Sequence, residues 1–157
     1  METINEVNEI QITYNPRPAI KYKAICSSIE VNEVLTMIFP ENQIALKEFF
    51  YVLLLNQANG ILGYFRLSEG GITSTPVDVR GIFQVALKAN ATGVLVAHNH
   101  PSGRTVPSAG DKAVTEKIKK AGAFLDIRLI DHLIIGNDGK DYFSCRGPWC
   151  RTGRKSL

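Results

Sequence analysis

The sequence predicts an α/β protein in which helices cover both faces of a mixed sheet. Residues 49–55 and 93–97 are continuous apolar segments with the length of strands that are buried on both faces. Residues 79–87 instead place apolar side chains at helical spacing, on one face. Short turn signals join other strand-like segments directly, which predicts antiparallel pairs beside helix-connected ones. We therefore expect a mixed-sheet α/β/α sandwich.

The N-terminal part of the chain predicts two extended pieces and one helix. Residues 9–13 alternate apolar and polar side chains and suit a short strand, and residues 20–25 suit a second extended piece. Ser27 or Ser28 should cap the helix, because apolar residues then recur at positions i, i+3, i+4 and i+7. The helix should end just before Pro40, since a proline ring does not fit a helix interior.

The middle of the chain predicts paired strands, a helix and a further strand. Residues 49–55 form the first strand, residues 61–67 return after a turn, and residues 72–75 are a further extended piece. Asp78 is a suitable cap for the amphipathic helix that follows it. Residues 93–98 form the strand that leads into the most informative stretch of the chain.

The last predicted elements are a helix and three short strands. The helix should run from Ser108 to Ala121, with Gly122 as its end. The strands and the tight turn that follow it are predicted at residues 124–130, 132–135, 137–140 (the turn) and 141–145.

Two of the three histidines of the chain stand at the end of a predicted strand. His98 and His100 are two residues apart, so a strand would present both imidazoles on one face. Ser108 is a good helix cap, which places Asp111 in the first turn of the next helix. Two imidazoles and one carboxylate give three protein ligands and leave a fourth position for water, the pattern of a catalytic zinc site. We therefore predict Zn²⁺ as the cofactor, bound by His98, His100 and Asp111.

Each part of this pattern also has a structural interpretation. A histidine on a strand is more often a hydrogen-bonded structural residue than a metal ligand, and Ser108-x-x-Asp111 has the spacing of a helix capping box. The paired histidines favour metal binding over coincidence. Capping and catalysis are compatible for Ser108, because its Oγ can cap the helix and still lie near the metal.

The same residues resemble a known family. His-x-His, seven residues, Ser, two residues and Asp is similar to the motif of the JAMM (MPN+) metalloproteases, and residues 98–103, 125–127 and 131–136 resemble the RadC-like branch. The likeness covers about residues 48–144. It implies a cytidine-deaminase-like core and zinc held by the two histidines and the aspartate. It also implies an upstream glutamate as general base and a serine that assists the oxyanion or the attacking water.

Hydrolysis of an amide needs a base that takes a proton from water and passes it to the leaving nitrogen. The upstream candidates are Glu30, Glu33, Glu41, Glu48 and Glu69. Glu48 stands directly before the most apolar strand, so its backbone should be held rigidly while its carboxylate lies at the end of the sheet. It also matches the position of the glutamate in the resembled family. The alternative is a charged residue that protects a hydrophobic strand from aggregation. We predict Glu48 as general base and Ser108 as oxyanion donor.

The remaining polar residues near strand ends are expected to be structural. We expect His132 to bond to backbone, with Asp131 as a partner for a metal-bound histidine as the alternative reading of that pair. Neither belongs to the predicted ligand set. The three cysteines, Cys26, Cys145 and Cys150, form no Cys-x-x-Cys motif and are expected to be plain thiols in a reducing compartment.

Length and composition predict one globular domain with short additions. The chain has 157 residues, of which 45% are hydrophobic. We divide it into an accessory strand and helix (residues 1–40), a RadC-like JAMM/MPN domain (41–145) and a basic tail (146–157). The net charge of +3 comes from the end of the chain, because residues 140–157 hold five Lys/Arg and one Asp. The rest of the chain has no basic excess that would indicate a phosphate-binding surface.

Location and partners follow from what the sequence lacks. The longest apolar run is too short to span a bilayer, and the N-terminus has no signal-peptide pattern, so we expect a cytoplasmic protein with no membrane partner. The leading hypothesis is a zinc-dependent metallopeptidase or isopeptidase that hydrolyses an amide bond of a peptide or protein-conjugate substrate. The alternatives are a DNA-associated protein of the RadC DNA-repair type, supported by the basic tail, and a catalytically silent metal-binding interaction module. No residue pattern selects the substrate or an oligomeric state.

Overall fold

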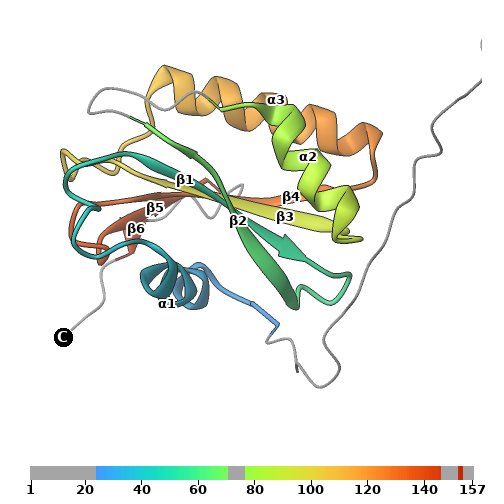
Figure 1. Ribbon diagram of the computed structural model, residues 1–157, viewed down its shortest axis with the longest axis horizontal. Helices are drawn as coiled ribbons and strands as arrows, with labels where there is room; N and C mark the ends of the chain where they lie inside the picture. Colours follow the sequence, from blue (N-terminus) through green and yellow to red (C-terminus); the bar gives the residue numbers. More distant parts are fainter. Residues whose placement is uncertain (1–23, 71–76, 146–151, 154–157) are drawn as a thin grey trace, which may run out of the picture.

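The computed structural model describes residues 24–70, 77–145 and 152–153. Within these residues six strands form one sheet in the order β2-β1-β3-β4-β5-β6, and three helices pack on it (Figure 1). The elements are α1 (Ser28–Ile38), β1 (Phe49–Leu55), β2 (Ile61–Glu69), α2 (Val79–Lys88), β3 (Gly93–Asn99), α3 (Ala109–Phe124), β4 (Arg128–Ile135), β5 (Tyr142–Ser144) and β6 (Thr152–Gly153).

The sheet is mixed. Strand β1 pairs antiparallel with both β2 and β3, β3 pairs parallel with β4 through the α3 connection, and β5 returns antiparallel beside β4. Helix α1 lies on one face of the sheet, while α2 and α3 lie on the other (Figure 1). The predicted mixed-sheet α/β/α sandwich is therefore confirmed.

Each face of the sheet has its own apolar core, because side chains of a strand alternate between faces. All seven residues of β1 are buried. The odd-numbered residues from Phe49 to Leu55 pack with Leu35 of α1, and the even-numbered ones from Phe50 to Leu54 pack with α2 and α3. Strand β3 repeats this alternation, so consecutive residues at its end point into different layers.

The starts of the helices confirm the capping predictions. Ser27 accepts a hydrogen bond from the amide of Glu30 at the start of α1, and Asp78 accepts one from the amide of Arg80 at the start of α2. Helix α1 ends at Ile38, two residues before Pro40. The hairpin predicted at residues 137–140 lies between β4 and β5. Gly139 takes a φ of +70° there, a conformation that favours glycine.

Two predictions for the segment after the metal motif are wrong. Helix α3 does not end at Gly122 but continues to Phe124. Glycine is required at position 122 because a Cβ there would overlap the carbonyl oxygen of Ile127. The turn out of the helix is instead made by Asp126, with φ of 55°. The two strands predicted at 124–130 and 132–135 are one strand, β4.

Strand β4 contains an irregularity that explains why its pattern was misread. Leu129 pairs with Val94 and Asp131 pairs with Leu95, which leaves Ile130 without a partner on β3. An extra residue of this kind reverses the facing of the side chains that follow it. His132, opposite Val96, therefore lies on the face covered by α2 and α3.

Some predictions fall outside the described residues. These are the strand at 9–13, the extended piece at 72–75 and most of the piece at 20–25, of which Ala24 forms a bridge with Gly60. Residues 152–153, which belong to the predicted tail, pair with β5. Among the described residues, none of the helices combines the length and the hydrophobicity needed to cross a bilayer.

Candidate metal centre

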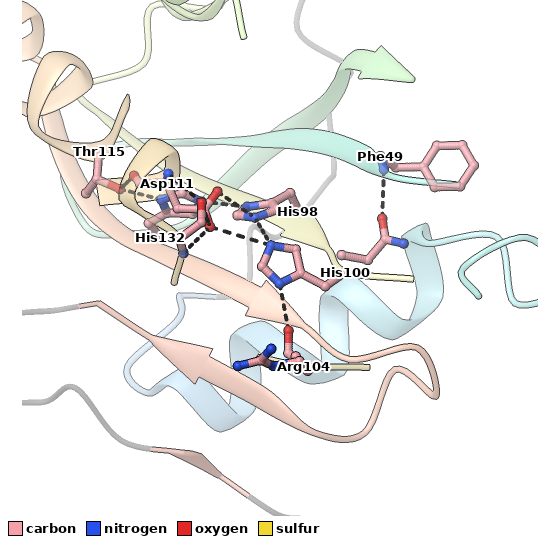
Figure 2. Close-up of polar contacts among 9 residues, drawn as sticks. Phe49, His98, His100, Arg104, Asp111, Thr115 and His132 are labelled. Carbon is pink, nitrogen blue, oxygen red and sulfur yellow. Dashed lines mark hydrogen bonds and ion pairs between the residues drawn. The ribbon is translucent and has the colours of Figure 1, made fainter. Parts of the chain in front are cut away.

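The end of β3 and the first turn of α3 bring three candidate metal ligands together. One ligand atom from each of His98, His100 and Asp111 lies within 4.8 Å of the others, and no other such group of His, Cys, Asp or Glu occurs among the described residues. The Nε2 atoms of the two histidines are 2.9 Å apart. Oδ1 of Asp111 is 3.1 Å from Nε2 of His98, and Oδ2 is 3.5 Å from Nε2 of His100 (Figure 2).

The start of α3 positions the aspartate. Ser108 Oγ accepts a hydrogen bond from the amide of Asp111, and the amide of Ser108 donates to Asp111 Oδ2 at 2.7 Å, which is a complete capping box. The structural reading of this spacing and the ligand reading are thus both compatible with the geometry, since the carboxylate caps the helix and also faces the histidines.

The loop between β3 and α3 positions His100. The backbone amide of His100 donates to Ile135 O at 2.9 Å, and its ring Nδ1 donates to Arg104 O at 2.6 Å. A carbonyl oxygen accepts only, so Nδ1 carries the hydrogen and a neutral His100 has its lone pair on Nε2. That lone pair points at His98 and Asp111 (Figure 2).

The charges of the cluster favour an ionised carboxylate. Burial opposes ionisation of Asp111, but hydrogen bonds with His100 and His98 outweigh it and hold the pKa of this carboxyl well below its usual range. The hydrogen bond with Asp111 raises the pKa of His100, against the opposing effect of burial. The two shifts have the same physical cause, the attraction between a positively charged imidazole and the carboxylate, and a cation bound at these atoms would experience the same attraction.

The donor set fits a divalent cation such as zinc. Two imidazole nitrogens and one carboxylate oxygen converge, and zinc is commonly bound by three ligands of these types in catalytic sites. The site is open on one side: the side chains of His100 and Asp111 are 19% and 15% exposed, whereas that of His98 is 1% exposed. An incoming molecule can thus reach the ligand atoms from the solvent side.

Glu48 lies at the same end of the sheet. It directly precedes β1, and by strand alternation it shares the face of Phe50, which pairs with His98. Burial raises the pKa of the Glu48 carboxyl, while His98 and His100 lower it and Asp111 raises it further. Glu48 is therefore close enough to all three candidate ligands to interact with them electrostatically.

Asn99, between the two histidines, fixes the backbone on either side of Glu48. Its Oδ1 accepts a hydrogen bond from the amide of Phe49, and its Nδ2 donates to the carbonyl oxygens of Ile44 and Lys47, each at 2.7 Å (Figure 2 draws the first of these). Asn99 is fully buried. The sequence pattern alone indicates no role for Asn99.

His132 is the residue that the sequence analysis misjudged. Its side chain does not bond to backbone: Nε2 lies 2.8 Å from Nδ1 of His98, and Nδ1 lies 2.6 Å from Oγ1 of Thr115 (Figure 2). Burial lowers the pKa of His132 to about 3, so its ring is neutral. The parallel pairing of β3 and β4 carries this contact, and no spacing within the sequence reveals that pairing.

The other polar residues near the site have structural contacts. Asp131 accepts hydrogen bonds from the amide of His132 and, at 2.6 Å, from Ser144 Oγ, which ties β4 to β5. Cys26 is a free thiol, and Cys150 lies outside the described residues.

Comparison with known proteins agrees with this geometry. The family model of the RadC-like JAB domain matches residues 25–149. A UPF0758 protein of Flavobacterium johnsoniae is 45% identical over 116 residues, which cover 74% of this chain and 49% of that protein. A UPF0758 protein of Chlorobaculum parvum is 45% identical over 100 residues, which cover 64% of this chain and 44% of that protein. A UPF0758 protein of Porphyromonas gingivalis is 47% identical over 98 residues, which cover 62% of this chain and 43% of that protein.

The chain thus spans about half the length of the curated relatives it matches. The name of these relatives carries no activity, but the RadC-like JAB domain is part of the JAMM superfamily of metalloproteases. The match includes the whole candidate metal centre, from Glu48 to His132. By the extent of this match, the chain belongs to the RadC-like JAB domain family.

Proposed function

We propose that this protein is a zinc-dependent hydrolase of amide bonds, a metallopeptidase or isopeptidase that acts on a peptide or protein-conjugate substrate. The observation that supports this proposal most directly is the convergence of His98, His100 and Asp111 at a partly open edge of the sheet. A structural zinc site would usually be closed by four protein ligands, whereas three ligands beside a half-buried carboxyl suit catalysis.

In this proposal each residue has one task. His98, His100 and Asp111 hold the ion, which when bound supplies a Lewis acid for the scissile carbonyl and lowers the pKa of a water. Glu48 accepts the proton of that water and delivers it to the leaving nitrogen. The raised pKa of its carboxyl suits a group that must both take and release a proton near neutral pH.

Ser108 is the proposed hydrogen-bond donor to the oxyanion. Its hydroxyl hydrogen is directed at Asp111 Oδ2, 2.7 Å away, so it has to turn from the carboxylate toward the substrate. The amide of Ser108 also bonds that oxygen and keeps the carboxylate in place while the hydroxyl turns. Donors of this type contribute about 3 kcal/mol to transition-state stabilisation.

Metal analysis tests the foundation of the proposal. Purified protein should contain one zinc ion per chain, and His98→Ala should contain none after the same handling. Glu33→Gln, on the exposed side of α1, serves as the control and should keep its zinc. Absence of zinc from the wild type, or unchanged zinc in His98→Ala, would contradict the proposed site.

Catalysis needs a separate experiment. A screen of peptides and isopeptide-linked conjugates should find cleavage products with the wild type and with Glu33→Gln, and none with Glu48→Gln, although Glu48→Gln keeps its zinc. If Glu48→Gln leaves the cellular function of the protein intact, the catalytically silent interaction module is the better description.

The DNA-associated alternative stays a prediction. Its support is the basic segment 146–157, most of which lies outside the described residues. If it is correct, deletion of residues 146–157 should weaken binding to duplex or single-stranded DNA and flatten its dependence on salt concentration.

A further inference from the structure

We propose that Thr115 and His132 are positioning residues that fix which ring nitrogen of His98 is available to the metal. The two side chains form a chain of hydrogen bonds that begins at the ring of His98 and ends at the backbone carbonyl of Asp111 (Figure 2). The inference rests on the proposed metal-binding function, because its consequence is the affinity of that site. It assigns a role to two residues outside the ligand set.

The direction of the chain is set at its far end. Oγ1 of Thr115 lies 2.5 Å from the carbonyl oxygen of Asp111, one helical turn back, and that oxygen accepts only. The hydroxyl has only one hydrogen, and it donates that hydrogen in this bond. Thr115 Oγ1 must then accept at its other contact, which is Nδ1 of His132 at 2.6 Å. His132 therefore carries a hydrogen on Nδ1.

The same logic passes to His98. A neutral imidazole has one N–H, and in His132 it is on Nδ1, so Nε2 of His132 accepts. Its partner is Nδ1 of His98 at 2.8 Å, which must therefore be protonated. The lone pair of a neutral His98 is then left on Nε2, the atom that faces Asp111 and His100. Metal ions bind an unprotonated ring nitrogen, so this is the tautomer that the site requires.

The surrounding packing holds the rings in this orientation. The ring of Phe50 is stacked on that of His98, with centroids 5.8 Å apart and an interplanar angle of 8°. Both His98 and His132 are 1% exposed, so water cannot replace a partner in the chain. The chain of hydrogen bonds also joins three elements, β3, β4 and α3, and it ends on the residue that supplies the carboxylate ligand. It therefore couples the position of α3 to the tautomer of His98.

A matched pair of substitutions at Thr115 tests the proposal. Thr115→Val keeps the shape of the side chain but removes the hydroxyl, whereas Thr115→Ser keeps the hydroxyl. The dissociation constant for Zn²⁺, measured by competition with a chromophoric chelator, should rise about tenfold in Thr115→Val, the effect of losing a partner of a metal-bound histidine. Thr115→Ser should bind zinc as the wild type does. His132→Phe should show a loss at least as large as Thr115→Val.

A second measurement does not require metal. In the zinc-free wild type, ¹⁵N spectra of the histidine rings should show a hydrogen on Nδ1 of both His98 and His132, and Thr115→Val should show a mixture of tautomers at His132. A His98 ring without a hydrogen on Nδ1 in the wild type would overturn the proposal, as would wild-type zinc affinity in Thr115→Val or an equal loss in Thr115→Ser. Failure of the wild type to bind zinc would instead contradict the proposed function. The tautomer spectra would still decide this inference.

Discussion

His98 and Asn99 are neighbours in the sequence and equally buried, yet their surroundings differ in kind. Asn99 faces the α1 layer, where its amide group makes three hydrogen bonds to backbone groups of residues 44–49. His98 faces the α2–α3 layer, where its Nε2 meets another ring nitrogen and a carboxylate. On one face of β3 the polar group is satisfied by the chain itself. On the other face, acceptors converge and a cation is needed to satisfy them.

The same contrast extends to the next strand. Asp131 of β4 lies opposite Leu95 on the α1 face and accepts a hydrogen bond from the hydroxyl of Ser144. His132, one residue later, lies on the other face and takes part in the chain to His98. The comparison teaches that buried polar residues have a structural role where their hydrogen-bond partners are other groups of the protein. They serve ligand binding where their lone pairs converge on an open edge.

The largest expected effect tests the open side of this comparison. Zinc should raise the free energy of unfolding of the wild type by about 4 kcal/mol when its free concentration is about a thousand times the dissociation constant. The same zinc concentration should change the unfolding of His98→Ala very little, because one of three ligands is missing. Urea denaturation with and without zinc measures both. Equal stabilisation of the two proteins would mean that the metal binds elsewhere.

Asn99→Ala tests the closed side. The substitution leaves the amide of Phe49 and the carbonyls of Ile44 and Lys47 without their partner, which should cost about 3 kcal/mol of unfolding free energy in zinc-free protein. The increment that zinc adds should remain, because Asn99 contacts none of the proposed ligands through these bonds. If Asn99→Ala lowered both the unfolding free energy of the zinc-free protein and the stabilisation that zinc adds, the two faces of β3 would not be independent.

The sequence predicted the sandwich, the helix caps and the three candidate ligands because these depend on local spacing. His98 and His100 share a strand face by alternation, and Asp111 is placed by the helix cap at Ser108. The roles of Asn99 and His132 depend instead on which strands become neighbours, and on the register between β3 and β4. Spacing within a segment carries no such information, so His132 was assigned to backbone bonding and Gly122 to a helix end.

Ser144→Ala should have an intermediate effect. Its hydroxyl donates to the buried carboxylate of Asp131 at 2.6 Å, and loss of this charge-assisted bond should lower the unfolding free energy by about 2 kcal/mol. Zinc affinity should be that of the wild type, as expected for a bond on the α1 face. A weaker zinc affinity in Ser144→Ala would place Asp131 in support of the metal site after all.

The smallest effect is expected at the exposed pair of Lys47 and Glu69. Its Nζ–Oε1 distance is 2.8 Å, and both side chains are well exposed, so Lys47→Met should leave the urea midpoint nearly unchanged. This substitution keeps the backbone carbonyl of Lys47, to which Asn99 donates. A large loss of stability would show that the side chain of Lys47, and not the hydrogen bonds made by Asn99, holds the segment before β1 in place.

The unpaired Ile130 of β4 determines which of two adjacent residues reaches the metal centre. If Ile130 paired with Leu95 instead, the pleat would run on without interruption, and every side chain from Asp131 onward would exchange faces. A carboxylate would then point at His98, and the imidazole of His132 would be turned into the apolar layer beneath α1. A single extra residue in β4 thus decides which face of the sheet the following side chains occupy. The length of this strand is therefore as much a part of the site as the identity of its residues.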